Sequence, residues 1–148
     1  MNIEVNNAFI RNIDDYQWTV KTENISVTYK FDEINGISIS SFKNLATNPA
    51  IEYVQNPYSI IPINAVKKGG KYEFINASAN EDAYGSAKVV SLKLKVRINS
   101  IVITLYSIAF PETSVIRQWF TIENESIARV ERFDYKPSVF KLSINDQR

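Results

Sequence analysis

Three pairs of adjacent acidic residues are the groups best suited to chemistry in this chain. They are Asp14-Asp15, Asp32-Glu33 and Glu81-Asp82. Two carboxylates that flank one bond could serve as the acid and the base of a glycosidase. Adjacent residues of a strand point to opposite faces, however, and acids in turns commonly accept hydrogen bonds from backbone amides. We therefore expect these pairs to be structural. A small carboxylate-based enzyme ranks third among the hypotheses for this chain, after the two binding roles described below.

The chain contains no histidine and no cysteine. This removes Ser-His-Asp and Cys-His nucleophiles, histidine general bases, disulfides and the usual zinc ligands. Only oxygen ligands remain for a metal, and no EF-hand spacing occurs. The paired Gly69-Gly70 lacks the rest of a phosphate-binding loop pattern. The sequence thus predicts no catalytic residue, no metal site and no cofactor in this chain.

Aromatic side chains give the strongest signal for binding. A sugar ring can stack its apolar C–H face on Trp or Tyr, with polar groups beside the ring for the hydroxyls. Tyrosines occur in a proline-interrupted segment and in a predicted polar loop, and loops often carry binding residues. Five residues are therefore candidates for a carbohydrate site or a domain interface: Tyr53, Tyr58, Tyr84, Arg117 and Trp119.

Each candidate also has a structural interpretation. Trp18 and Trp119 lie on predicted strands, where packing in the core is the expected role. Arg117 shares strand parity with Trp119, so it can pair with a carboxylate, stack on the indole or reach a domain interface. For the three tyrosines, packing or contact with a neighbouring domain is the default interpretation.

Period-two alternation defines the strands that would position these groups. In the stretch 88–98, Val90, Leu92, Leu94, Val96 and Ile98 alternate with Ser91, Lys93, Lys95 and Arg97. The stretch 101–110 is apolar on both faces, which predicts a central position in a sheet. Only Asn99-Ser100 separates the two stretches, so we expect an antiparallel hairpin.

Further strands are predicted at 3–10, 16–22, 24–31, 37–44, 72–77, 115–122, 127–135 and 139–144. Asn35-Gly36 is a strong hairpin turn, because both residues tolerate positive φ. Prolines interrupt the stretch 45–71, which we expect to be an irregular connection or an edge segment. The stretch 78–87 is predicted to be a polar loop. Many strands and no helical stretch predict an all-β fold, a sandwich or a barrel.

Size and charge restrict the class of partner. A length of 148 residues suits one domain, 1–148. A net charge of +1 gives no electrostatic footprint for nucleic acid. No stretch approaches the roughly 20 apolar residues that span a bilayer, and the first residues lack a signal-peptide pattern. We expect a soluble protein with neither nucleic acid nor a membrane as partner, and its compartment stays open.

Two stretches resemble one known family. Phe110-Pro111, followed by TSVIRQWFTIEN at 113–124, is similar to a strand pattern of the N-terminal β-sandwich of α-galactosidase (melibiase-type) glycoside hydrolases, in which Arg, Trp and Asn recur at this spacing. The piece GISISSFKN at 36–44 resembles a second pattern of that domain, a glycine followed by a strand that ends in Asn. Both motifs are short, but their order and separation agree, so the resemblance spans most of the chain.

The resemblance implies a two-sheet antiparallel supersandwich, of the galactose-mutarotase type, that packs against a catalytic (β/α)₈ barrel. In that family the barrel carries the catalytic aspartates, and a chain of 148 residues has no room for it. No catalytic residue can therefore be carried over, and the histidine of related mutarotases is missing. The leading hypothesis is a non-catalytic accessory domain of a bacterial glycosidase that supports the barrel and contacts oligosaccharide. The alternative is an autonomous carbohydrate-binding module.

Overall fold

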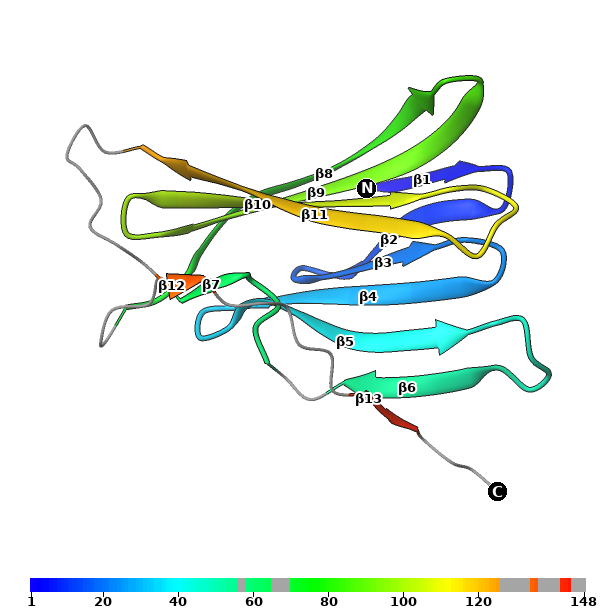
Figure 1. The fold of residues 1–148 in the computed structure, drawn as a ribbon, viewed down its shortest axis with the longest axis horizontal. Helices are drawn as coiled ribbons and strands as arrows, with labels where there is room; N and C mark the ends of the chain where they lie inside the picture. The colour runs from blue at the N-terminus through cyan, green and yellow to red at the C-terminus, as the bar shows by residue number, and fades with distance from the viewer. Residues whose placement is uncertain (56–57, 65–69, 126–133, 136–141, 145–148) are drawn as a thin grey trace.

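The computed structural model describes residues 1–55, 58–64, 70–125, 134–135 and 142–144. These residues contain strands β1 to β13 and no helix, and hence no helix long and apolar enough to cross a membrane. The strands form two large antiparallel sheets that pack against each other (Figure 1). The predicted all-β, two-sheet antiparallel sandwich is therefore confirmed.

The first sheet is a meander to which one late strand is added. Its order is β1-β2-β3-β4-β5-β6-β13. The strands are β1 (Asn2–Val5), β2 (Ala8–Asp14), β3 (Gln17–Lys21), β4 (Ile25–Asp32), β5 (Gly36–Asn44), β6 (Ile51–Gln55) and β13 (Leu142–Ile144). Because β1 to β6 follow one another in both sequence and space, each is positioned by a hairpin with its neighbour.

The second sheet is also a meander, with the order β11-β10-β9-β8. Its strands are β8 (Glu73–Tyr84), β9 (Ala87–Ile98), β10 (Ile101–Ala109) and β11 (Ile116–Asn124). A separate two-stranded pair joins β7 (Ile63–Asn64) to β12 (Asp134–Tyr135). The predicted β9–β10 hairpin is confirmed, with Ile98 opposite Ile101 across the two-residue turn.

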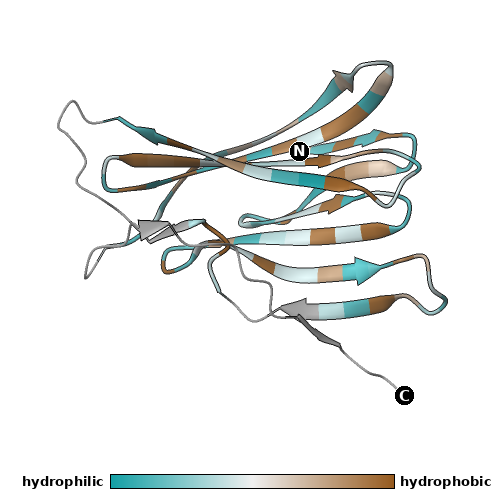
Figure 2. Cartoon of the chain, in the orientation of Figure 1, coloured by the Kyte–Doolittle hydropathy of each residue, from teal (hydrophilic) through white to brown (hydrophobic). Residues whose placement is uncertain are grey.

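The core lies between β1–β5 of the first sheet and β8–β10 of the second. Strand β1 contacts β8 and β9, β2 contacts β9, and β3 contacts β10. The largest fully buried side chains are Trp18, Tyr29, Ile10, Ile37, Ile60, Ile61, Leu92, Leu94, Ile98, Ile103, Leu105 and Val20. On β10, Leu105 faces this core, and Val102 and Ile108 on the opposite face are also buried. The predicted central position of that strand is confirmed, and Figure 2 shows its apolar character.

Two of the predicted boundaries are wrong. The stretch 3–10 is two strands, because Asn6 and Asn7 both adopt positive φ, 44° and 70°, and form a tight turn. The supposed polar loop at 78–87 belongs mostly to β8 and β9. The stretch 45–71, expected to be an irregular connection or an edge segment, contains β6 near the edge of the first sheet and β7 in the two-stranded pair. The strands predicted at 127–135 and 139–144 fall mainly outside the described residues, which include β12 and β13 within them.

Candidate functional site

An apolar cleft lies between the two sheets at one side of the sandwich. Its volume is about 470 Å³, and its walls are Ile25, Val27, Tyr29, Ile39, Phe42, Ile116, Gln118 and Phe120. Strands β4 and β5 supply one wall, and β11, an edge strand of the second sheet, supplies the other. In Figure 1, β5 and β6 extend beyond β11, so the second sheet does not cover them in that view. Apolar clefts of this volume with few polar groups are typical binding sites.

Hydrogen bonds of the Tyr29 hydroxyl join the two sheets beside this cleft. The hydroxyl donates to Gln118 Oε1 at 2.7 Å, and it lies 2.9 Å from Ser107 Oγ, which is then its donor. Tyr29 is completely buried, and burial raises the pKa of its hydroxyl, with the Ser107 hydrogen bond opposing the rise in part. Within the described part of the chain, the Gln118 amide nitrogen has no hydrogen-bond partner, so a donor remains at the cleft wall.

We expect Tyr29→Phe to flatten the alkaline pH dependence of stability. Because the pKa of Tyr29 is raised by burial, the folded state holds this proton more tightly than the unfolded state. The resulting stability is complete below the unfolded pKa of about 10 and decreases as the pH rises above it, by about 1.4 kcal/mol per pH unit. Burial also raises the pKa of Tyr72, and this residue contributes equally to the pH dependence of stability in both proteins.

Urea unfolding of the wild type and of Tyr29→Phe between about pH 8 and about pH 11 measures this effect. At the lower pH the variant should be less stable by about 1–3 kcal/mol, since two polar partners lose their hydrogen bonds. Above pH 10 the difference should shrink. Parallel curves over the whole range would show that the hydroxyl is not protected in the folded state.

A row of cations and aromatic rings crosses the outer face of the second sheet. Lys93, Tyr106 and Trp119 are direct cross-strand partners on β9, β10 and β11. The Tyr106 and Trp119 rings are stacked, with centroids 5.0 Å apart and planes 5° from parallel. The Lys93 ammonium lies 5.6 Å from the Tyr106 ring centroid, and the Arg117 guanidinium lies 5.3 Å from that of Trp119. We call these four residues the aromatic row.

The aromatic row corrects one expectation and agrees with another. Trp119 does not pack in the core between the sheets, because Phe120, its neighbour on β11, has the inward parity and packs against the core instead. Trp18 does occupy the core, as predicted. Arg117 stacks on the indole, which is one of the three roles that strand parity allowed for it.

None of the three candidate tyrosines is a member of the aromatic row. Tyr53 is on β6 rather than in an irregular connection, and its ring lies 6.0 Å from that of Phe42 in the cleft wall. Tyr84 ends β8 rather than lying in a loop, and its ring packs against Phe110 at 5.7 Å. Tyr58 does lie in the connection, and it is 53% exposed. Tyr53 and Tyr84 thus contact the rings of Phe42 and Phe110 rather than those of the aromatic row.

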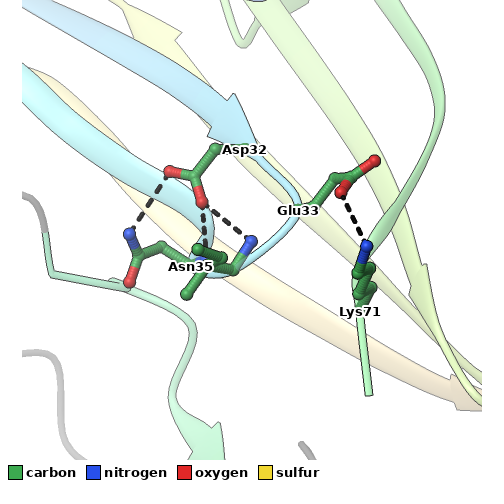
Figure 3. Close-up of polar contacts among 5 residues, drawn as sticks. Asp32, Glu33, Asn35 and Lys71 are labelled. Atoms are coloured by element: carbon green, nitrogen blue, oxygen red, sulfur yellow. Dashed lines mark hydrogen bonds and ion pairs between the residues drawn. The ribbon is translucent and has the colours of Figure 1, made fainter. Parts of the chain in front are cut away.

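The acidic pairs serve local structure. Asp14 accepts hydrogen bonds from the Tyr16 amide and the Gln17 side chain, at 3.0 and 2.7 Å. Asp32 accepts from the backbone amides of Ile34 and Asn35, at 2.9 and 2.7 Å (Figure 3).

Three further acids of these pairs, Glu33, Glu81 and Asp82, are held by cations or by a hydroxyl. Glu33 lies 3.5 Å from the Lys71 ammonium, as Figure 3 also shows. Glu81 pairs with Lys88 at 3.6 Å, and Asp82 accepts a hydrogen bond from the Ser91 hydroxyl. In the residues that the structure describes, no group of three or more acids is placed to hold a metal ion.

These observations define the class of protein as a two-sheet antiparallel β-sandwich with a lateral apolar cleft and an aromatic row on its outer face. No protein-family model matches the sequence, and no curated protein or solved structure matches it either. The function is therefore inferred from the site itself and from the two short motifs that resemble the α-galactosidase family.

Proposed function

We propose that this chain is a non-catalytic accessory module of a glycoside hydrolase of the α-galactosidase type. The observation that supports this most directly concerns the two stretches that resemble the family. The stretch 36–44 is strand β5, and the stretch 113–124 contains β11. Although far apart in sequence, these strands provide facing walls of the same apolar cleft. Both family-like stretches therefore contribute to one structural feature, the cleft, as expected if they are signatures of one domain.

The proposed role of the cleft is to receive apolar side chains of a catalytic barrel domain. Ile39 and Phe42 on one wall face Ile116 and Phe120 on the other. Ile122, which shares the inward parity of Phe120 on β11, is 38% exposed, so the apolar surface continues beyond the cleft. Continuous apolar surface of this kind marks interaction sites on soluble proteins. The free amide nitrogen of Gln118 adds one polar contact to the same wall.

Catalysis is assigned to the partner rather than to this chain. The sequence has no histidine or cysteine, and acids from each of the three pairs are occupied in turns, ion pairs or a hydroxyl contact. A chromogenic α-galactoside should therefore not be hydrolysed by the isolated chain. Turnover that survives further purification would contradict the accessory role.

The gene on either side of the coding region offers the first test. We expect the reading frame to encode a (β/α)₈ barrel with glycosidase aspartates, and a frame without one would oppose the proposal. Once the barrel has been produced, Phe42→Ser should weaken its association with this chain by tenfold or more, about 1.4 kcal/mol. Buried aromatic anchors carry much of the binding energy of an interface, and this substitution removes one.

The matched control is Ile34→Ser, in the Asp32–Gly36 turn. Ile34 is 80% exposed and lies outside the cleft, so this variant should associate normally. Thermal unfolding of both variants separates a lost contact from a lost fold. Equal association of Phe42→Ser and Ile34→Ser would show that the barrel binds elsewhere.

The second candidate function is an autonomous carbohydrate-binding module. It is favoured by the aromatic row on the outer face of the second sheet, where two aromatic rings lie among charged and polar groups. Calorimetric titration with neutral galacto-oligosaccharides tests it without any partner. Absence of heat at about millimolar sugar, a concentration that corresponds to a binding free energy of about −4 kcal/mol, would count against it.

A further inference from the structure

The outer face of the second sheet is basic in its middle and acidic at its ends. Directly opposed residues share a face, so the register defines cross-strand rows. One central row is Asn76, Lys95, Thr104 and Thr121; the next is Ser78, Lys93, Tyr106 and Trp119; the third is Asn80, Ser91, Ile108 and Arg117. These central rows contain three cations, two aromatic rings and several hydroxyl and amide groups, but no acid.

The three central cations have no carboxylate partner in the described residues. Lys93 and Arg117 lie over aromatic rings, and no ion pair forms at Lys95. Three acids of this face are engaged elsewhere, and the fourth, Glu123, lies outside the central rows, opposite Val102. Glu73 and Glu125 both pair with Arg97, at 3.9 and 2.9 Å. Asp82, at the other end, is bound to the Ser91 hydroxyl. The positive charge of the central rows is therefore not neutralised locally.

We propose that this face binds an acidic oligosaccharide, a chain of uronic-acid sugars, across the aromatic row. Arg117 would hold a sugar carboxylate through its planar fork, and the lysines Lys93 and Lys95 would hold the next as point charges. Cross-strand neighbours are about 4.8 Å apart, so β9 and β11 are separated by about 10 Å across the sheet. Arg117 lies one row further along the strands than Lys93. Between them, the Tyr106 and Trp119 rings offer apolar edges to the C–H groups of the sugars, since the faces of the rings contact each other and the two cations.

The polar residues around the row suit the remaining groups of a sugar. Asn76, Ser78, Asn80 and Thr121 occupy the flanking positions of the same rows, and their hydroxyl and amide groups can both donate and accept. This inference rests on the carbohydrate side of the proposed function and not on the docking of the cleft. It adds the class of sugar, which the resemblance to α-galactosidases does not supply.

Single-stranded nucleic acid also combines charge with stacking, but it fits this face less well. A nucleic-acid groove is basic along its whole length, with positive charge that follows every phosphate. Here Glu73 and Glu123 flank the row at one end and Asp82 lies at the other, so a long polyanion would meet acids at both ends. The net charge of the chain is only +1. A short acidic sugar chain that spans only the central rows does not reach the acids at either end.

The experiment is calorimetric titration of the whole chain with tetragalacturonate, with its methyl-esterified form, with neutral galactotetraose and with a short oligothymidylate. We expect binding of the acidic sugar that weakens as salt is added, and at least tenfold weaker binding of the other three. Tighter binding of the neutral sugar would overturn this inference but leave the carbohydrate function standing. Tighter binding of the oligonucleotide, or no binding of any probe, would overturn both.

Charge-matched variants place the binding on this face. Arg117→Gln should weaken binding of the acidic sugar by about tenfold, as expected when a charged hydrogen bond is lost. Lys30→Gln removes the same charge from β4, where the exposed side chain lies on the other sheet, and should change binding less than twofold. Arg117→Lys should give an intermediate loss, because it keeps the charge without the fork. Equal effects of Arg117→Gln and Lys30→Gln would overturn the proposed site.

Discussion

Gly36→Ala should destabilise this protein by about 2–5 kcal/mol. Gly36 has φ of +72°, a conformation that costs a residue with a Cβ atom about 1–2 kcal/mol. A Cβ atom at this position would also lie 2.6 Å from Ile61 Cδ1 and 2.9 Å from Tyr72 Cδ1. Both neighbours are buried in the core, so they cannot move away freely, and overpacking of this kind costs about 1–3 kcal/mol.

Gly85→Ala is the matched control. Gly85 also has positive φ, +61°, but nothing lies within 4 Å of the position of its Cβ atom. Only the conformational cost of about 1–2 kcal/mol remains. Urea unfolding with a common m-value measures both variants. Equal losses would show that the connection carrying Ile61 and Tyr72 does not pack against this turn in solution.

The alternation of β9 and β10 made the second sheet largely predictable. A two-residue turn at Asn99-Ser100 fixes the register of the hairpin, so each residue of β9 has a single partner on β10. The pairing of Lys93 with Tyr106 follows from that turn by counting. This half of the aromatic row can therefore be predicted from the sequence, although Lys93 and Tyr106 are not among the five candidate residues.

Strand β8 could be recognised from its sequence only as far as Ala77, for a physical reason. Its residues NASANEDA at 76–83 are small or polar, with little difference in hydropathy between the two faces. A bulge between Phe74 and Asn76 then shifts the parity, so a strict period of two fails even where apolar residues occur. Pairing with β9 holds this segment as a strand, and pairing between strands is not visible in the strand alone.

The cleft was beyond the reach of sequence analysis as well. Ile116, Gln118 and Phe120 alternate with Arg117, Trp119 and Thr121, so either face of β11 could have been the inner one. The choice depends on the packing of the second sheet over β4, which the hydrogen bond between Tyr29 and Gln118 records. Such a contact between residues far apart in the chain has no local signature. For the two tryptophans, the choice between the inner and the outer face of a sheet has the largest effect on stability.

Trp18→Ala should be the costlier of the two tryptophan substitutions, by a wide margin. Trp18 is 2% exposed in the core, and its ring stacks on Phe74 with centroids 5.5 Å apart. Phe74 also contacts the rings of Tyr16 and Phe31, so the indole fills one part of an aromatic cluster. Removal of the indole loses its burial and leaves a cavity, which together cost about 3–5 kcal/mol.

Trp119→Ala should cost only about 1–2 kcal/mol. Trp119 is partly exposed on the outer face, and its loss removes one ring stack with Tyr106 and one cation contact with Arg117. Urea unfolding followed by far-ultraviolet circular dichroism reports both variants without relying on tryptophan fluorescence. If Trp119→Ala proves as costly as Trp18→Ala, a further element covers the aromatic row in solution, and the acidic-sugar site would then be closed. The comparison therefore measures stability and tests the accessibility on which binding depends.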